Sequence, residues 1–289
     1  MPSDNLLEKV KKLREITGVG FKDCKNAIDE SNGDIEKSIE HLRKKGIVKA
    51  NKRMDRVAAE GLVCIYEKDN KFSIIEVNSE TDFVAKNNEF INFVEEISQI
   101  NLIQEGIMSK ILLSKMKNNK NVNDSLIDLV TKIGEKITIR RSAFVEGKNL
   151  INFSYVHSAM KKNIGKLGVI LSLKTTKHKN DLVEFGKQLA MHIAASSPLA
   201  IEKESLNVNI LEKEKEIIAE ELKNSGKDIK IIDKIAEGKL NKFISDNTLL
   251  NQEWIFEPKK KVKDIIKEIS GKDKIIVKNF IRFKVGEGV

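Results

Sequence analysis

Residues 60–77, with the sequence EGLVCIYEKDNKFSIIEV, decide the fold class, because the hydrophobic period changes here from 3.6 residues to 2. Two runs, residues 62–66 and 72–77, are rich in β-branched and aromatic residues, and the polar residues 68–71 separate them. Such a pattern is typical of a β-hairpin. The chain on both sides of this hairpin follows helical periods, so we predict an α+β protein.

The region before the hairpin, residues 1–54, predicts a bundle of three short helices. Apolar residues recur at helical spacing in each helix, and breaks at residues 17–20 and 32–34 separate them. We expect Gly46 to end the third helix, since glycine is common just after a helix C-terminus. A solvated basic linker should follow at the end of this region, with Lys44, Lys45, Lys49, Lys52, Arg53 and Arg56.

The region after the hairpin predicts two blocks with the same order of elements. The first adds a helix from about Asn88, a helix over residues 125–135 and a strand over residues 137–145. The second has strands near residues 151–157 and 167–174 and then a helix over residues 181–193, which Pro198 halts. We therefore predict two α+β subdomains.

A charged helical pair is inserted in the second block. Its apolar stripes face each other across a turn at residues 224–226, which predicts an antiparallel helical hairpin over residues 206–245. These apolar residues are either buried between the two helices or form a surface for self-association, and the sequence does not decide between the two. A short helix up to Gly271 and a strand over residues 275–285 close the chain. The predicted domains are 1–54, 55–147 and 148–289, the last including the hairpin.

The composition restricts the class of protein. The 289 residues carry 52 Lys and Arg against 43 Asp and Glu, a net charge of +9. No stretch approaches the run of about 18 apolar residues that a membrane span needs, so we expect no membrane association. The first residues, MPSDNLLEKV, contain acids where a secretory or transit signal would exclude them, which predicts a cytoplasmic protein. Cys24 and Cys64 are in no metal-binding spacing and are expected to be buried free thiols.

Motifs of enzyme chemistry are missing from the sequence. There is no Walker loop, HExxH or GxSxG motif, and the four histidines are scattered without i, i+4 pairing. We therefore predict that the protein is not an enzyme and has neither a cofactor nor a metal site. Aromatic residues make up 5% of the chain and most lie at apolar-face spacings, which argues against the stacking platforms of single-strand binders. Direct nucleic-acid binding is not expected.

The segment of residues 78–87, NSETDFVAKN, places an acid beside a large aromatic residue after a strand. On composition alone, Thr81 or Asp82 caps a short helix while Phe83 and Val84 enter the core.

A resemblance favours another interpretation of this segment. Several motifs occur in one order along nearly the whole chain and resemble those of the bacterial elongation factor Ts family, the guanine-nucleotide exchange factors of elongation factor Tu. These motifs are VKKLREITGVG (10–20), DCKNA (23–27), NGDIE (32–36), RKKG (43–46), TDFVAKN (81–87), KIGEKI with RR (132–141), SYVH (154–157), AMHIAAS (190–196) and FIRFKVGEG (280–288). Each motif alone is weak evidence for the family, but their occurrence in this order is specific to it.

The resemblance implies an α+β fold with an N-terminal three-helix domain similar to ubiquitin-associated domains, two core subdomains and an inserted antiparallel helical hairpin. It implies that the protein is a translation elongation factor. It would bind the GDP form of elongation factor Tu and accelerate GDP release, so that GTP enters, without binding nucleotide itself. The resemblance leaves undecided whether the protein forms a homodimer within a 2:2 complex with Tu, and whether the helical hairpin takes part in self-association.

The resemblance also implies which residues contact Tu. Asp82 and Phe83, here called the wedge, would enter Tu's nucleotide domain and loosen the Mg²⁺ and phosphate contacts. The other implied contacts are Thr81, Val84, Ile133, His157, Met191 and His192. For Ile133 a purely core role is an equal alternative. Two other classes of protein stay open, an RNA-associated basic protein and a ubiquitin-like-domain adapter; steep salt-dependent retention on RNA would indicate the former.

Overall fold

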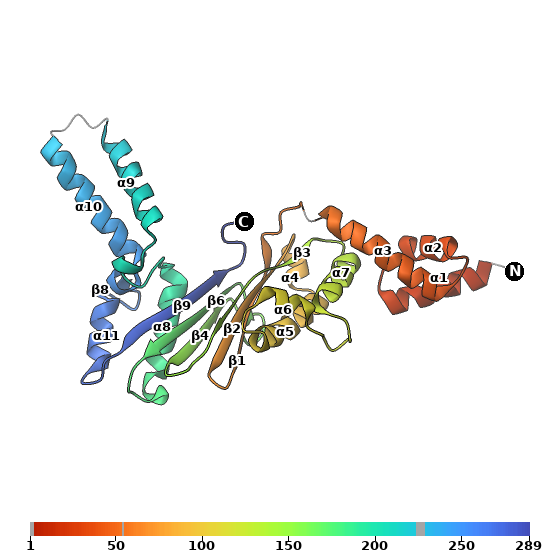
Figure 1. The fold of residues 1–289 in the computed structure, drawn as a ribbon, viewed down its shortest axis with the longest axis horizontal. Helices are drawn as coiled ribbons and strands as arrows, with labels where there is room; N and C mark the ends of the chain where they lie inside the picture. The colour runs from red at the N-terminus through yellow and green to blue at the C-terminus, as the bar shows by residue number, and fades with distance from the viewer. Residues whose placement is uncertain (1–2, 54, 224–228) are drawn as a thin grey trace. The chain divides into compact units, whose positions relative to one another are not determined.

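The computed structural model describes residues 3–53, 55–223 and 229–289 and shows a mixture of helices and sheets, as expected for an α+β protein. Figure 1 shows the order of these elements along the chain. The chain divides into two compact units. Unit 1 comprises residues 1–145, 156–168 and 283–289, and unit 2 comprises residues 146–155 and 169–282. The division into domains 1–54, 55–147 and 148–289 stays a prediction.

Unit 1 begins with the predicted helical bundle, α1 (Ser3–Thr17), α2 (Phe21–Glu30) and α3 (Ile35–Arg53). The break after α1 contains Gly18, whose φ of 67° lies in the left-handed region that glycine adopts without strain. Cys24 and Cys64 are buried free thiols, as predicted. The three helices enclose their own core of Val10, Leu13, Val19, Cys24, Ala27, Ile28 and Leu42.

The predicted end of the third helix at Gly46 is wrong, because α3 continues through this residue to Arg53. Gly46 is buried, and a Cβ there would lie 2.5 Å from the Thr131 Oγ1 on α7 (Val122–Ile133). The glycine therefore permits a close approach of two helices. Some of the basic residues assigned to a solvated linker also have partners, since Arg53 Nη1 donates to the Val130 carbonyl at 3.1 Å.

The predicted β-hairpin is confirmed as β1 (Glu60–Lys68) and β2 (Lys71–Ser79), paired antiparallel from Glu60–Ser79 to Lys68–Lys71. Asp69 and Asn70 form the two-residue loop, and both have positive φ, at 51° and 60°. Two positive φ values are the mark of a type I′ turn, whose twist matches that of the flanking strands. The sheet continues in the order β3-β2-β1-β5, with β3 (Ile137–Val145) and β5 (Ile164–Gly165) at its edges.

Helices cover one face of this sheet. The predicted helix from Asn88 is α5 (Asn88–Ile103), which Asn87 caps by accepting from the backbone N–H of Glu89 and Phe90. Helix α7 starts three residues earlier than predicted, at Val122, and ends at Ile133, where Gly134 with a φ of 88° caps its C-terminus. The short helix α4 (Asp82–Ala85) agrees with the composition-based interpretation, in which Thr81 or Asp82 caps a short helix, whereas α6 (Met108–Leu113) was not predicted. Fully buried residues such as Phe90, Ile97, Ile75 and Val77 join the helices to the sheet.

Unit 2 contains most of the second sheet, in the order β4-β6-β9, with strands β4 (Ile151–His157), β6 (Leu167–Lys174) and β9 (Ile276–Lys284). The 3₁₀ turn η1 (Lys179–Leu182) leads into α8 (Val183–Ser196). Gly186 brings α8 against the sheet, since a Cβ there would lie 2.4 Å from the Phe153 ring. The remaining elements are η2 (Lys203–Ser205), η3 (Leu249–Asn251), β7 (Glu253–Trp254), β8 (Glu257–Lys261) and α11 (Val262–Ser270).

The predicted helical pair is present as α9 (Val208–Lys223) and α10 (Ile229–Asn247), drawn in cyan and blue in Figure 1. The turn predicted at residues 224–226 lies outside the described residues. Ile218 and Leu222 are buried, while Ile217 on the same helix is half exposed. Part of the apolar stripe is therefore satisfied within the protein, and self-association stays a prediction. Within the described ranges, no helix combines the length and the apolar character needed to cross a bilayer.

Candidate partner-binding site

The candidate site is the short connection from β2 to α5 in unit 1. Strand β2 ends at Ser79, and the four-residue helix α4 follows with Thr81 at its N-terminus. The N–H of Lys86 and that of Asn87 close the turn by donating to the carbonyls of Phe83 and Val84. Asn87 then caps α5, so the connection is fixed between two regular elements.

Phe83 and Val84 have opposite environments. Phe83 is 78% exposed, whereas Val84 is 5% exposed and joins the core under α5. The composition-based alternative, in which both residues enter the core, is therefore wrong for Phe83. The four-residue helix turns the two consecutive side chains to different sides. An exposed aromatic side chain on an anchored turn is a feature of interaction sites, since such rings contribute much of the binding energy at interfaces.

Asp82 lies beside Phe83 with its carboxylate about half exposed. Lys86 Nζ, one turn further along, donates to Asp82 Oδ2 at 2.7 Å. This hydrogen bond holds the pKa of Asp82 below its ordinary value, so the residue is an anion at neutral pH. The wedge thus combines an apolar ring and a negative charge on one turn of helix.

The residue before the wedge is anchored by a carboxylate that the sequence interpretation missed. Glu135 accepts two hydrogen bonds from Thr81, one from its backbone N–H at 3.0 Å and one from its Oγ1 at 2.8 Å. Gly134, in the left-handed conformation, turns the chain after α7 and places Glu135 there. The KIGEKI motif contained this residue, but its spacing alone does not reveal the contact with Thr81.

Glu80 provides a second anchor. Its carboxylate accepts from the backbone N–H of Lys136 at 2.5 Å and from Arg56 Nη1 at 3.2 and 3.3 Å. The Lys136 ammonium in turn donates to the Arg56 carbonyl at 2.7 Å. Residues 80 and 81 are therefore both tied to residues 135 and 136, which lead into the edge strand β3.

Ile133 and His157 also belong to unit 1. Ile133 is partly buried at the end of α7 and packs against the core under the sheet, two residues before Glu135. His157 is exposed at the end of β4, and its carbonyl accepts from the Lys166 N–H at 3.2 Å.

Met191 and His192 lie on α8 in unit 2, and His192 requires a correction. Its side chain is 0% exposed and stacks on Trp254 with ring centroids 5.2 Å apart. Nδ1 accepts from the Ile255 N–H at 3.4 Å, which leaves Nε2 to donate to Gln252 Oε1 at 3.0 Å. Burial lowers the pKa of His192, in agreement with a neutral ring. The imidazole stabilises the turn between β7 and β8 and offers no surface for a partner, whereas Met191 is partly exposed.

Metal ligation has no support in the described ranges, where no group of three or more His, Cys, Asp or Glu side chains is placed to hold an ion. The arrangement is suited to binding another molecule by shape, apolar contact and charge.

Comparisons with known proteins identify the family. Residues 80–287 match the family model described as Elongation factor TS. A protein of Nitrobacter hamburgensis named Elongation factor Ts is 40% identical over 282 residues, covering 97% of this chain and 92% of its own. Proteins with the same name from Bartonella henselae and Rickettsia prowazekii are 41% and 40% identical, covering 97% of this chain and 92% and 91% of their own. The chain therefore belongs to the elongation factor Ts family of translation elongation factors.

Proposed function

We propose that this protein binds the GDP form of elongation factor Tu and accelerates the release of GDP, so that GTP can enter. The observation that carries the proposal is the 78% exposed ring of Phe83 on an anchored turn beside the Asp82 carboxylate. Family membership supplies the partner. The protein performs no chemistry on the nucleotide and would act in the cytoplasm, where translation takes place.

The wedge would act by displacing the contacts that hold Mg²⁺ and the phosphates. These contacts supply much of the affinity of a nucleotide in such sites, because the metal ion bridges the phosphate oxygens. Phe83 is 78% exposed, and burying a phenylalanine side chain on a partner contributes about 1.5–3 kcal/mol. Asp82 would accept hydrogen bonds from Tu at the edge of the slot that the ring fills.

The anchors of residues 80 and 81 matter for this mechanism. A flexible loop would lose conformational entropy when it inserts, and it would change its own conformation instead of that of the partner. A preformed turn avoids this cost, so more of the binding energy is available to change the conformation of Tu. The bonds from Thr81 to Glu135 and from Arg56 and Lys136 to Glu80 provide that preformed turn.

Exchange also requires that GDP and the factor weaken each other's binding to Tu. By linkage the effect is reciprocal, so excess GDP must displace the factor from Tu. The factor needs no nucleotide site of its own. Isolated protein should accordingly show no saturable heat of GDP or GTP binding.

The deciding experiment is stopped-flow release of a fluorescent GDP from Tu, with and without this protein. We expect a large acceleration that saturates with the concentration of the factor. Phe83→Ala should reduce this acceleration without abolishing it, because the Asp82 carboxylate and the other contacts with Tu remain. Leu113→Ala, which removes another exposed apolar side chain of unit 1 (76% exposed), is the matched control and should retain the acceleration. Unchanged GDP release with wild-type protein that binds Tu would refute the proposal.

A further inference from the structure

A β-bulge places two arginines on one face of the sheet in unit 1. Glu76 on β2 pairs with Arg141 on β3, whereas Val77 pairs with Ile139, so Arg140 is an extra residue in the edge strand. Neighbouring side chains of a regular strand point to opposite faces. The bulge removes this alternation, and both guanidinium groups reach the same carboxylate.

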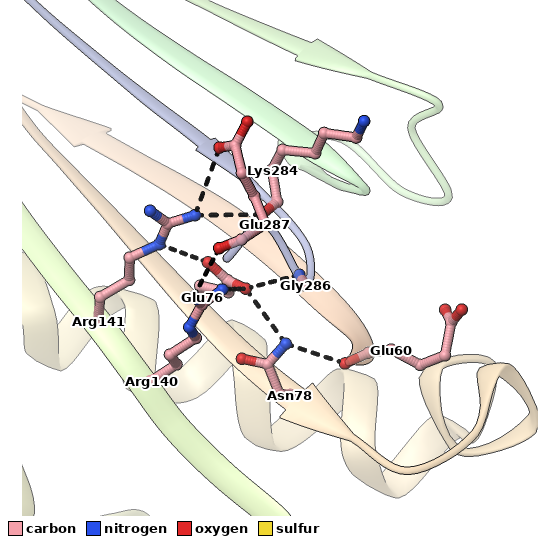
Figure 2. Close-up of polar contacts among 8 residues, drawn as sticks. All are labelled: Glu60, Glu76, Asn78, Arg140, Arg141, Lys284, Gly286 and Glu287. Atoms are coloured by element: carbon pink, nitrogen blue, oxygen red, sulfur yellow. Dashed lines mark hydrogen bonds and ion pairs between the residues drawn. The ribbon is translucent and has the colours of Figure 1, made fainter. Parts of the chain in front are cut away.

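That carboxylate belongs to Glu76, which is 0% exposed. Figure 2 shows the donors that surround it: Arg141 Nε donates to Oε2 at 2.5 Å, while Arg140 Nη1 and Asn78 Nδ2 donate to Oε1 at 3.0 and 3.1 Å. The backbone N–H of Gly286 also donates to Oε1, at 3.0 Å. A buried carboxylate is tolerated only with such compensation, since removing its partners costs several kcal/mol.

The same arginines hold the C-terminal segment, residues 283–287. Arg140 Nη2 donates to the Glu287 carbonyl at 2.6 Å, and Arg141 Nη2 donates to the Lys284 carbonyl at 3.1 Å (Figure 2). The Arg141 guanidinium also lies 4.3 Å from the centre of the Phe283 ring. We call Glu76, Asn78, Arg140, Arg141 and residues 283–287 together the Glu76 cluster.

Gly286 fits this position because its backbone is left-handed and closely packed. Its φ is 73°, and a Cβ on it would lie 2.2 Å from the Ala59 carbonyl oxygen. Ala59 directly precedes β1, so the C-terminal segment packs against the start of the hairpin. Any side chain at position 286 must displace one of the two backbones.

The Glu76 cluster is continuous with the anchors of the wedge. Asn78 Nδ2 donates both to Glu76 Oε1 and to the Glu60 carbonyl, each at 3.1 Å. Ser79 Oγ then donates to the Thr81 carbonyl at 2.9 Å. The chain between Glu76 and Phe83 is therefore fixed at residues 76, 78, 79, 80 and 81.

We propose that the Glu76 cluster positions the wedge. The C-terminal segment holds the end of β2 in place and thereby determines the position of Asp82 and Phe83. The inference rests on the proposed exchange function. Glu76, Arg141 and Gly286 are positioning residues, which act through the strand and do not touch the partner. A displacement of about 1 Å at a reacting or inserting group can lower a rate by up to roughly a hundredfold.

Gly286, inside the C-terminal segment, and Gly288, directly after it, provide a matched test. Gly286 and Gly288 have φ of 73° and 76°, so alanine causes similar backbone strain at both, but a Cβ at Gly288 has its nearest neighbour at 3.8 Å, in Arg140 Nη2. We expect Gly286→Ala to slow GDP release at saturating factor about tenfold, a change that corresponds to roughly 1.4 kcal/mol. Gly288→Ala should stay within about twofold, a difference of less than roughly 0.5 kcal/mol.

A double-mutant cycle with Phe83→Ala separates positioning from general destabilisation. If the cluster acts through the wedge, Gly286→Ala should cause no further slowing once Phe83 has been removed, because coupled residues are not additive. Equal slowing in both backgrounds would overturn the proposal, and so would a normal rate for Gly286→Ala alone. Failure of wild-type protein to accelerate release would instead refute the proposed function.

A second variant covers the case in which Gly286→Ala does not fold, as judged by circular dichroism at the assay temperature. Arg141→Lys keeps the positive charge beside Glu76 but loses the fork that also reaches the Lys284 carbonyl. We expect slower release in the wild-type background and no additional slowing with Phe83→Ala. A normal rate for folded Arg141→Lys would contradict the proposal.

Discussion

At the scale of single residues, Phe83 and Val84 provide contrasting variants. Phe83→Ala should leave the melting temperature nearly unchanged because the ring is 78% exposed, yet it should weaken binding to Tu by about 2 kcal/mol or more as an interface hot spot. Val84→Ala should do the reverse and lower stability by about 1 kcal/mol, since Val84 is 5% exposed and loses core contacts. Thermal unfolding and calorimetric titration with Tu on both variants check this. A Phe83→Ala protein that melts much earlier would contradict the exposed placement.

Glu135 is the residue whose effect on the wedge is most direct. Glu135→Ala removes the acceptor of both Thr81 hydrogen bonds, and we expect GDP release at saturating factor to slow about tenfold, or roughly 1.4 kcal/mol. Thr81→Ser retains the hydroxyl and the backbone N–H and should behave as wild type. Stopped-flow measurement of both variants tests the anchor, and an unaffected Glu135→Ala would show that the turn holds its shape without it.

His192 makes the stability of unit 2 depend on pH. Its pKa is lowered below the ordinary 6.5 by burial, against the opposing effect of the Gln252 hydrogen bond. As the pH falls below about 6.5, the unfolded chain binds a proton that the folded protein does not, so the contribution to stability is complete above this pH and decreases below it. Denaturant unfolding followed by Trp254 fluorescence between about pH 7.5 and 5.5 measures the effect, because these limits lie roughly one unit on either side of the ordinary pKa. His192→Gln should show a flatter pH dependence, and equal slopes would contradict the assignment.

At the scale of elements, Gly46 determines how closely α3 approaches α7. Gly46→Ala raises helix propensity, by about 1 kcal/mol, but places a Cβ 2.5 Å from Thr131 Oγ1. We expect a net loss of stability, partly restored by Thr131→Ala. A Cβ at Gly238 on α10 would meet no atom within 4 Å, so Gly238→Ala should be stabilising by about 1 kcal/mol. Thermal unfolding compares the three variants, and a stabilising Gly46→Ala would show that the two helices are not held together.

The regular elements were predictable because their signals are local. The alternation in residues 60–77 predicted β1 and β2, and the apolar face from Asn88 predicted α5. Helix α6 and the β7–β8 hairpin are too short to show a period, and they were missed. Gly46 was misinterpreted because a glycine permits either a helix end or a close contact, and Thr131, distant in the sequence, decides between them.

The candidate site shows the same limit. The segment of residues 81–87 was found through its resemblance to a family, since composition favoured a buried Phe83. Glu135, Glu80 and the Arg140 bulge depend on pairing between distant strands, and no pattern within either strand reveals it. His192 lies on an apolar helix in a family motif, and only the packing of Trp254 shows that its ring is enclosed.

At the scale of the whole molecule, the N-terminal helices have a core of their own. Residues such as Leu13, Cys24, Ile28 and Leu42 pack among α1, α2 and α3. Domains of about this size often fold alone, although with a small margin of stability. We expect a fragment of residues 1–56 to be helical and to unfold cooperatively, as measured by circular dichroism. A fragment without a thermal transition would show that the contacts of α3 with α7 are required.

The Glu76 cluster has a consequence for folding during synthesis. Strand β2 and the bulged strand β3 leave the ribosome long before residues 283–287, so Glu76 and its arginines initially lack the Gly286 N–H and the two carbonyls that complete the cluster. Domains generally fold as units in the order in which they are made. Unit 1, whose chain is discontinuous, departs from that order. The contacts between its first sheet and residues 283–287 can form only after that last segment has been synthesised. A nascent protein arrested before residue 283 should therefore be cleaved by proteases in β1–β3 more readily than the full-length chain.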